Sequence, residues 1–185
     1  IISKCGIQMM SENRNNSIKH YSYSKEYIIA SAEQSLKHLQ TDYLDLLLLH
    51  RPSPLMHADV IAEAVEKLTT TGKILDFGVS NFTPSQCNLI ETKTKINYNQ
   101  IEFSVTHLEP MLDGSLDHMQ TNRITPMCWS PLGTVFRNDN GQSQRIQKVA
   151  NELASKYEVS NDIILLAWIL KHPSGILPVC GTSDQ

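Results

Sequence analysis

A histidine follows directly after the most apolar run of the chain, and its position there is the first indication of chemistry in the sequence. The run Leu44-Asp45-Leu46-Leu47-Leu48-Leu49 is followed by His50, Arg51 and Pro52. Four consecutive leucines leave no polar face, which predicts a strand buried on both sides, as in a parallel sheet covered by helices. Such sheets bind ligands beyond the carboxyl ends of their strands. His50 is therefore the first candidate functional residue, although a histidine at a strand end is often only structural.

A lysine lies inside the strand-like stretch at the start of the chain, Ile1-Ile2-Ser3-Lys4-Cys5-Gly6-Ile7. A lysine in such a stretch is usually a surface residue whose apolar stem lies along the sheet. From the residues alone, Lys4 is therefore a weaker candidate than His50. The chain opens with Ile in an apolar stretch, whereas a genuine N-terminus is more often polar. We therefore expect a fragment.

Composition bounds the function classes. With 185 residues, 41% of them hydrophobic and 19% charged, the chain can bury one core, and its net charge of −3 provides no basic field for nucleic acid. It contains no run of membrane-spanning length and no signal-peptide pattern, so we expect a cytoplasmic protein without a membrane partner. The cysteines are too far apart for zinc or a disulfide framework, which predicts no metal site and four reduced thiols: Cys5, Cys87, Cys128 and Cys180.

Strand and helix patterns alternate along the chain. Periodicity and capping signals predict helices after Ser24, at 58–71, after the capping box at 83–86, at 113–122, at 144–157 and at 161–171. Apolar runs predict strands at 1–7, 44–49, 74–79, 98–103, 124–129 and 176–180. Three helices should bury the following faces: Ile28, Ala32, Leu36 and Leu39; Ile146, Val149, Ala150, Leu153 and Ala154; Ile163, Ile164, Ala167 and Trp168.

This alternation predicts parallel strands joined by right-handed crossovers, either in an open doubly wound sheet or in a (β/α)8 barrel. Periodicity alone does not separate the two. The absence of G-x-G-x-x-G after the first strand counts against the open nucleotide-binding sheet. A barrel holds eight units in roughly 250 residues, whereas about six strands are predicted here. We therefore expect one α/β domain over residues 1–185, a partial (β/α)8 TIM barrel.

Seven short segments together resemble the aldo/keto reductase superfamily. They are Ser3-Lys4-Cys5-Gly6, residues 47–52, Gly72-Lys73-Ile74, Gly78-Val79-Ser80-Asn81-Phe82, Tyr98-Asn99-Gln100-Ile101-Glu102, Trp129-Ser130-Pro131-Leu132-Gly133 and residues 178–183. Each is common alone, but their order and spacing agree with the family from end to end. The chain is most similar to the bacterial predicted-oxidoreductase branch, because no long loop separates Phe103 from Ile124. The resemblance implies a barrel truncated at both ends, without its first two strands and its C-terminal end.

The resemblance also implies an activity. Members of the family reduce aldehydes or ketones to alcohols by hydride transfer from NAD(P)H, here expected to be NADPH, with NADH as the alternative. The expected partner is a small-molecule carbonyl substrate, and the complete protein is expected to be a monomer. An alternative from another class is a non-catalytic nicotinamide-binding subunit that senses redox state and regulates a partner.

Two catalytic roles follow from the resemblance. Lys4 matches the lysine that pairs with a carboxylate and lowers the pKa of an acidic tyrosine. His50 matches the residue that hydrogen-bonds the substrate carbonyl. The family's tyrosine and aspartate belong to the strands before Ile1, so we expect this chain alone to be inactive. Tyr21 and Tyr23 match no family acid.

The remaining matches concern the cofactor. Ser80, Asn81 and Gln100 resemble the residues that hold the nicotinamide carboxamide, and Trp129 replaces the aromatic residue, more often tyrosine, that stacks on the ring. Other family residues surround the phosphates, and their matches here are Ser130, Pro131, Leu132 and Gly133, with available backbone amides, and Gly181, Thr182 and Ser183. Asp184 lies where many members have a basic residue for the 2′-phosphate, which predicts weak discrimination against NADH.

Overall fold

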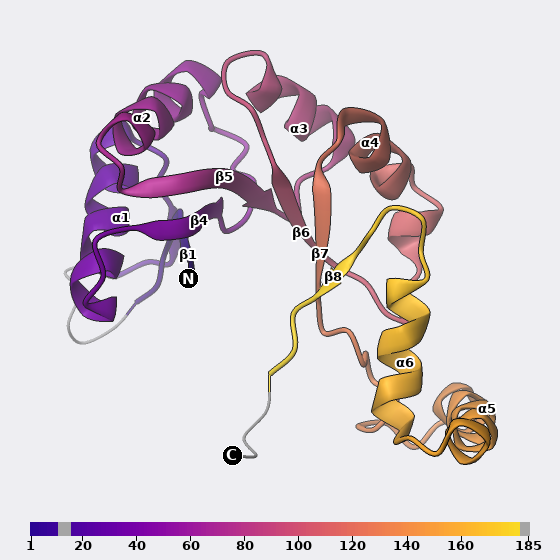
Figure 1. Ribbon diagram of the computed structural model, residues 1–185. Coiled ribbons are helices and arrows are strands. Elements are labelled where there is room, and N and C mark those ends of the chain that lie inside the picture. Colours follow the sequence, from indigo (N-terminus) through magenta and orange to yellow (C-terminus); the bar gives the residue numbers. More distant parts are fainter. Residues whose placement is uncertain (11–15, 182–185) are drawn as a thin grey trace. The chain divides into compact units, whose positions relative to one another are not determined.

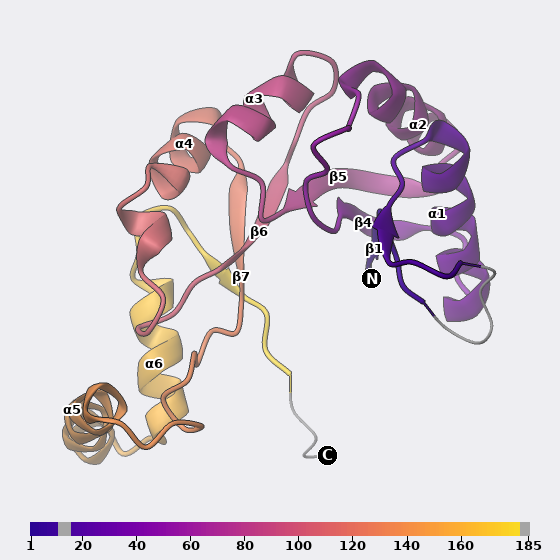
Figure 2. The same ribbon diagram turned by 180° about the vertical axis from the view of Figure 1, so that it is seen from behind.

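The computed structural model describes residues 1–10 and 16–181 of the chain. Its backbone falls into two compact units, residues 1–99 and 100–185. In each unit, helices alternate with strands along the chain, as Figures 1 and 2 show from opposite sides. The alternation predicted from the sequence is therefore confirmed.

The first unit is a layer of parallel strands covered by helices. Its strands are β1 (Ile2–Cys5), β4 (Leu44–Leu49) and β5 (Ile74–Ser80), and its helices are α1 (Lys25–Leu39), α2 (Ala58–Thr70) and α3 (Pro84–Glu91). A small antiparallel pair, β2 (Ile7–Gln8) and β3 (His20–Tyr21), follows β1. The sequence analysis did not predict this pair.

The strand register brings the candidate residues Lys4 and His50 to the same end of the parallel strands. Lys4 of β1 lies beside Leu48 of β4, which lies beside Gly78 of β5. One step further along, the backbone N–H of His50 donates to the carbonyl oxygen of Cys5 at 2.8 Å. The carboxyl ends of β1 and β4 therefore lie side by side, with Lys4 and His50 near them.

Strand β4 is the centre of this unit's core. Leu44, Leu46, Leu47, Leu48 and Leu49 are all buried, and only Asp45 is exposed. Helix α1 buries Ile28, Ala32 and Leu36, and α2 buries Ile61, Ala64, Val65 and Leu68. The prediction of a strand enclosed on both faces is confirmed.

Helix ends are set by the capping residues expected from the sequence. The hydroxyl of Ser24 accepts the backbone N–H of Tyr27 at 3.2 Å and caps α1. At α3, the Thr83 hydroxyl accepts the N–H of Gln86, and the Gln86 side chain accepts the N–H of Thr83, which completes the predicted capping box.

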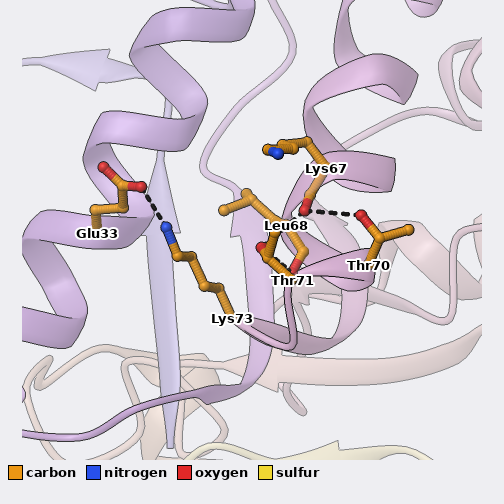
Figure 3. A network of polar contacts seen from close by, with 6 residues as sticks. All are labelled: Glu33, Lys67, Leu68, Thr70, Thr71 and Lys73. Carbon is orange, nitrogen blue, oxygen red and sulfur yellow. Dashed lines mark hydrogen bonds and ion pairs between the residues drawn. The ribbon is translucent and has the colours of Figure 1, made fainter.

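A polar network joins α1 to the end of α2 and the start of β5. The hydroxyls of Thr70 and Thr71 both donate to the carbonyl oxygen of Lys67, at 3.1 and 2.8 Å (Figure 3). They thereby satisfy a carbonyl at the helix end. Lys73, just before β5, pairs with Glu33 of α1. Because this ion pair is largely exposed, it contributes only about 0–1 kcal/mol.

The second unit contains the later elements. They are the end of β6 (Tyr98–Glu102), a 3-10 turn at Glu109–Met111, α4 (Ser115–Asn122), β7 (Thr125–Trp129), α5 (Gly141–Tyr157), α6 (Asn161–Leu170) and β8 (Leu177–Pro178). Strands β7 and β8 pair in parallel, with Met127 beside Leu177 and Cys128 beside Pro178. Phe103, which follows β6, stacks on Trp168 of α6 with ring centroids 5.4 Å apart.

Six of the strands belong to one sheet, in the order β1-β4-β5-β6-β7-β8. This order follows the chain, as in a barrel, and differs from the order of a doubly wound sheet, which reverses at its centre. The predicted fold class, a partial barrel of about six parallel strands with covering helices, is therefore confirmed.

The predicted inner faces of three helices need correction. Leu39 is exposed at the end of α1, because the helix ends there and Gln40 adopts the left-handed cap conformation. On α5, Val149 is exposed, whereas Ala150 and Ala154 are buried. On α6, the buried residues are Leu165 and Ile169, in place of the predicted Ile163, Ile164, Ala167 and Trp168. Helix α6 is apolar nearly all round, so periodicity could not identify its buried face.

We predict that Leu47→Ala lowers the free energy of unfolding by about 2–5 kcal/mol, because it removes a fully buried side chain from the centre of β4. Leu75→Ala is the matched control, since Leu75 lies in the neighbouring strand β5 and is 59% exposed. Its cost should stay within about 0.5 kcal/mol. Urea unfolding followed by circular dichroism measures both, and equal costs would contradict the central place of β4.

Candidate functional site

Lys4 and His50 border one cavity at the carboxyl ends of β1 and β4. The cavity has a volume of about 550 Å³. Its remaining lining comes from the chain that follows β1 and from α1, and includes Gln8, Tyr27, Ser31, Gln34 and His38. Most of these side chains are polar. Lys4 and His50 are the two members of this lining that the sequence analysis selected for chemistry.

The surroundings of Lys4 and His50 lower the pKa of both side chains. Partial burial lowers the pKa of the Lys4 ammonium group. Burial is also the main cause of a lowered pKa at His50, and the positive charges of Lys4, Arg51 and Lys19 add to it. A neutral imidazole therefore persists to lower pH at His50 than for a histidine in water.

Ser80 and Asn81 lie at the carboxyl end of β5. Ser80 is buried, and its hydroxyl accepts a hydrogen bond from the Asn81 side-chain amide at 3.0 Å. Asn81 has a φ of +57°, in the left-handed region that few residues other than glycine adopt. Such strain is common at functional sites. The two neighbouring polar groups thus have a fixed mutual orientation.

Gln100 and Trp129 belong to the second unit. Gln100 is buried in β6, and Trp129 is the half-buried last residue of β7. Ser130, which follows Trp129, has a φ of +51°. Strand β7 therefore ends, like β5, in a polar residue held in the left-handed conformation.

The loop from Ser130 to Gly133 is held by the segment after β6. The Thr106 hydroxyl accepts the backbone N–H of Thr134 at 3.2 Å, and the Ser104 hydroxyl lies 3.2 Å from that of Thr106. Gly133 has a φ of +56°, and a Cβ added there would lie 2.1 Å from the Thr106 hydroxyl oxygen. Only glycine satisfies both constraints.

The expectation of available amides in this loop needs correction. The N–H of Gly133 donates to the carbonyl oxygen of Ser130 at 2.8 Å, and Pro131 has no N–H. The tight turn thus uses an amide that could otherwise hold a phosphate. Sequence inspection alone could not reveal this use, because several turn conformations are compatible with proline and leucine at the two central positions, Pro131 and Leu132.

The sequence analysis missed a cationic side chain, Arg137, that lies beside this loop. The four loop residues and Gly181 line a second cavity of about 370 Å³, together with Phe136, Arg137, Val179 and Cys180. Among the lining residues that the structure describes, Arg137 alone carries a charge. Its position four residues after Gly133 was a possible signal in the sequence. An anion is therefore the expected ligand of this cavity.

Three positions of the expected phosphate site lie outside the described residues. They are Thr182, Ser183 and Asp184. The expectations attached to them, including weak discrimination against NADH, remain predictions.

Three of the four cysteines have buried thiols whose pKa values are raised. Cys5, Cys87 and Cys128 are buried free thiols, and burial raises their pKa values to about 12, 12 and 11. Cys180 is a free, exposed thiol. Over residues 1–10 and 16–181, no cluster of three or more His, Cys, Asp or Glu side chains could hold a metal ion. None of the helices in these ranges has the length and apolar character needed to cross a membrane.

Two curated bacterial proteins are similar to this chain over nearly its whole length. Oxidoreductase YdhF of Escherichia coli is 45% identical and is matched by 98% of this chain. The uncharacterized oxidoreductase YcsN of Bacillus subtilis is 42% identical and is matched by the entire chain. The chain spans only 62% and 64% of their respective lengths, less than two thirds of either relative.

A solved structure and a family profile agree with these relatives. The aldo/keto reductase from Klebsiella pneumoniae in complex with NADP and acetate is 28% identical, with a TM-score of 0.77 over 88% of this chain and 56% of that protein. The profile described as the Aldo/keto reductase family matches residues 1–185. With the fold and the strand-end residues described above, these matches show that the chain belongs to the aldo/keto reductase family.

Proposed function

We propose that the protein reduces an aldehyde or ketone to an alcohol with hydride from NADPH, or from NADH as the alternative cofactor. The observation that carries this proposal is that Lys4 and His50 border one cavity at the carboxyl ends of neighbouring parallel strands. Membership of the aldo/keto reductase family supports it. We also propose that residues 1–185 belong to one domain, in agreement with a single family match over the whole chain.

In this proposal, His50 binds the oxygen of the substrate carbonyl. Its lowered pKa keeps the imidazole neutral at neutral pH, and a neutral imidazole still carries one N–H donor. As hydride adds to the carbonyl carbon, negative charge develops on the oxygen. A hydrogen bond aimed at that oxygen is stronger in a partly desolvated cavity than in water, so it favours the transition state over the ground state.

Lys4 provides positive charge beside the same oxygen. Its effect on the pKa of His50 indicates that the two groups interact electrostatically. The charge on Lys4 would stabilise an alkoxide, and it would also lower the pKa of a phenol placed next to it. We assign no residue of this chain as the proton donor.

The proposed cofactor is supported by the chemistry of the residues present. The cavity at the Ser130–Gly133 loop is lined by one guanidinium, from Arg137, and otherwise by uncharged residues, which suits a pyrophosphate. When bound, the cofactor would supply the hydride. Ser80, Asn81 and Gln100 are proposed to hold the nicotinamide carboxamide, and Trp129 to stack on the ring, on the basis of the family motif alone.

The adenosine end of the cofactor is proposed to bind at residues 181–184. Gly181 lines the same cavity as Arg137 and is proposed to lie against a phosphate. Thr182 and Ser183 are proposed to bind the phosphate near the adenosine on the basis of the family motif alone. Asp184 would disfavour the 2′-phosphate of NADPH, so the preference for NADPH over NADH should be modest.

We predict that Lys4→Met lowers kcat for carbonyl reduction by about 10²-fold or more, because the charge near the developing alkoxide is lost. The dissociation constant of NADPH should change little. Steady-state oxidation of NADPH and a separate fluorescence titration of the cofactor measure the two quantities on the purified complete protein.

A matched control and a second measurement make this test specific. Lys25→Met removes an exposed lysine that pairs with Glu63 on α2, and it should leave kcat unchanged. In an NMR titration, Lys4→Met should raise the pKa of His50, since a neighbouring positive charge no longer opposes its protonation. An unchanged kcat for Lys4→Met would contradict the proposed mechanism. Normal NADPH binding without turnover of any carbonyl by the unmodified complete protein would favour the regulatory alternative.

We predict that Arg137→Gln raises the dissociation constant of NADPH by about tenfold, because a charge-assisted contact to phosphate is lost. At saturating cofactor, kcat should be retained. Arg145→Gln, on the exposed surface of α5, is the control and should bind NADPH normally. If the unmodified protein, Arg137→Gln and Arg145→Gln all bind NADPH with equal affinity, the phosphates of the cofactor do not contact Arg137.

A further inference from the structure

We propose that Tyr23 is a positioning residue, which fixes the backbone next to His50 and thereby the direction in which the imidazole faces its cavity. This inference rests on the proposed function for its effect on catalysis. The structural part is that the Tyr23 hydroxyl holds the backbone just after β4. It depends only on contacts within the first unit.

The hydroxyl of Tyr23 makes two hydrogen bonds to a single residue, the one directly after His50. It donates to the carbonyl oxygen of Arg51 and accepts the backbone N–H of Arg51, the latter at 3.3 Å. On the other side, the N–H of His50 donates to the carbonyl oxygen of Cys5 at 2.8 Å. The backbone is therefore held both before and after the Cα atom that carries the imidazole.

The ring of Tyr23 is itself held in place. Tyr23 is buried, and its ring occupies the space beside Gly6, where an added Cβ would lie 2.0 Å from the ring atom Cε1. Gly6 has a φ of +110°, which only glycine adopts readily. The N–H of Ser22 donates to the carbonyl oxygen of Gly6 at 2.9 Å, and Tyr21 pairs with Ile7 in the β2–β3 ladder. The antiparallel pair β2–β3 thus sets the position of Tyr23.

Tyr23 does not fit the role of proton donor. Burial raises the pKa of its phenol, and this outweighs the opposing effect of the Arg51 hydrogen bond. Its proton is already donated to the carbonyl oxygen of Arg51. The phenol therefore acts through the backbone, as a fixed support for His50.

The test compares Tyr23→Phe with Tyr21→Phe. Tyr23→Phe removes both hydrogen bonds to Arg51 and keeps the ring beside Gly6, whereas Tyr21 is exposed on β3 and its variant should behave like the unmodified protein. For Tyr23→Phe, we expect kcat to fall by about tenfold to 10²-fold, the cost of a misplaced catalytic group. The KM for NADPH should not change, and the pH profile of kcat should keep the same number of ionisations.

A readout that does not require activity separates this inference from the proposed function. The pKa of His50 is lowered by burial and by Lys4, Arg51 and Lys19. In Tyr23→Phe, a less restrained imidazole should be better hydrated, so its pKa in an NMR titration should rise. In the unmodified protein, the amide of Arg51 should be protected from hydrogen exchange, a measurement that remains decisive even when the variant fails to fold.

Each result has a distinct meaning. An unchanged pKa of His50 in a folded Tyr23→Phe protein, or rapid exchange of the Arg51 amide in the unmodified protein, would overturn the positioning role. A loss of more than about 10³-fold, with one ionisation missing from the pH profile, would make Tyr23 the proton donor. If the unmodified complete protein reduces no carbonyl compound, the proposed function fails, and the titration and exchange data still decide the role of Tyr23.

Discussion

The burial of β4 on both faces is the constraint on which the rest of the first unit depends. A strand with no polar face cannot lie at a surface, so it must have neighbours on both edges and apolar cover on both sides. Strands β1 and β5 fill the edges, and their register with β4 follows from parallel pairing. This register brings Lys4, His50 and Ser80 to the carboxyl ends of the strands, although none of them contributes apolar surface to the core.

The sequence predicted well those features that depend on local patterns. The capping residues Ser24 and Thr83 and the leucine strand were identified correctly, because caps and apolar runs depend on residues close together in the chain. The direction of the α6 helix face was predicted wrongly. Its residues are apolar on nearly every side, so the pattern along the helix does not distinguish the buried residues, Leu165 and Ile169, from the others.

Features of the candidate site that depend on backbone angles could not be predicted. The N–H of Gly133 donates to the carbonyl oxygen of Ser130 inside a turn whose first and last residues both have positive φ angles. The two hydrogen bonds between the Tyr23 hydroxyl and the backbone of Arg51 join residues that are 28 positions apart in the sequence. Family motifs select residues that touch the ligands, and they do not reveal the residues that support them.

Strands β5 and β7 end in the same way, with a non-glycine residue, Asn81 or Ser130, in the left-handed conformation. Each costs the folded state on the order of 1 kcal/mol relative to glycine. Glycine at either position would relieve the strain but would remove a polar side chain at the mouth of the sheet. Relief of strain in the folded state is opposed by the greater freedom that glycine gives the unfolded chain, so the two positions can keep their polar side chains at little net cost in stability.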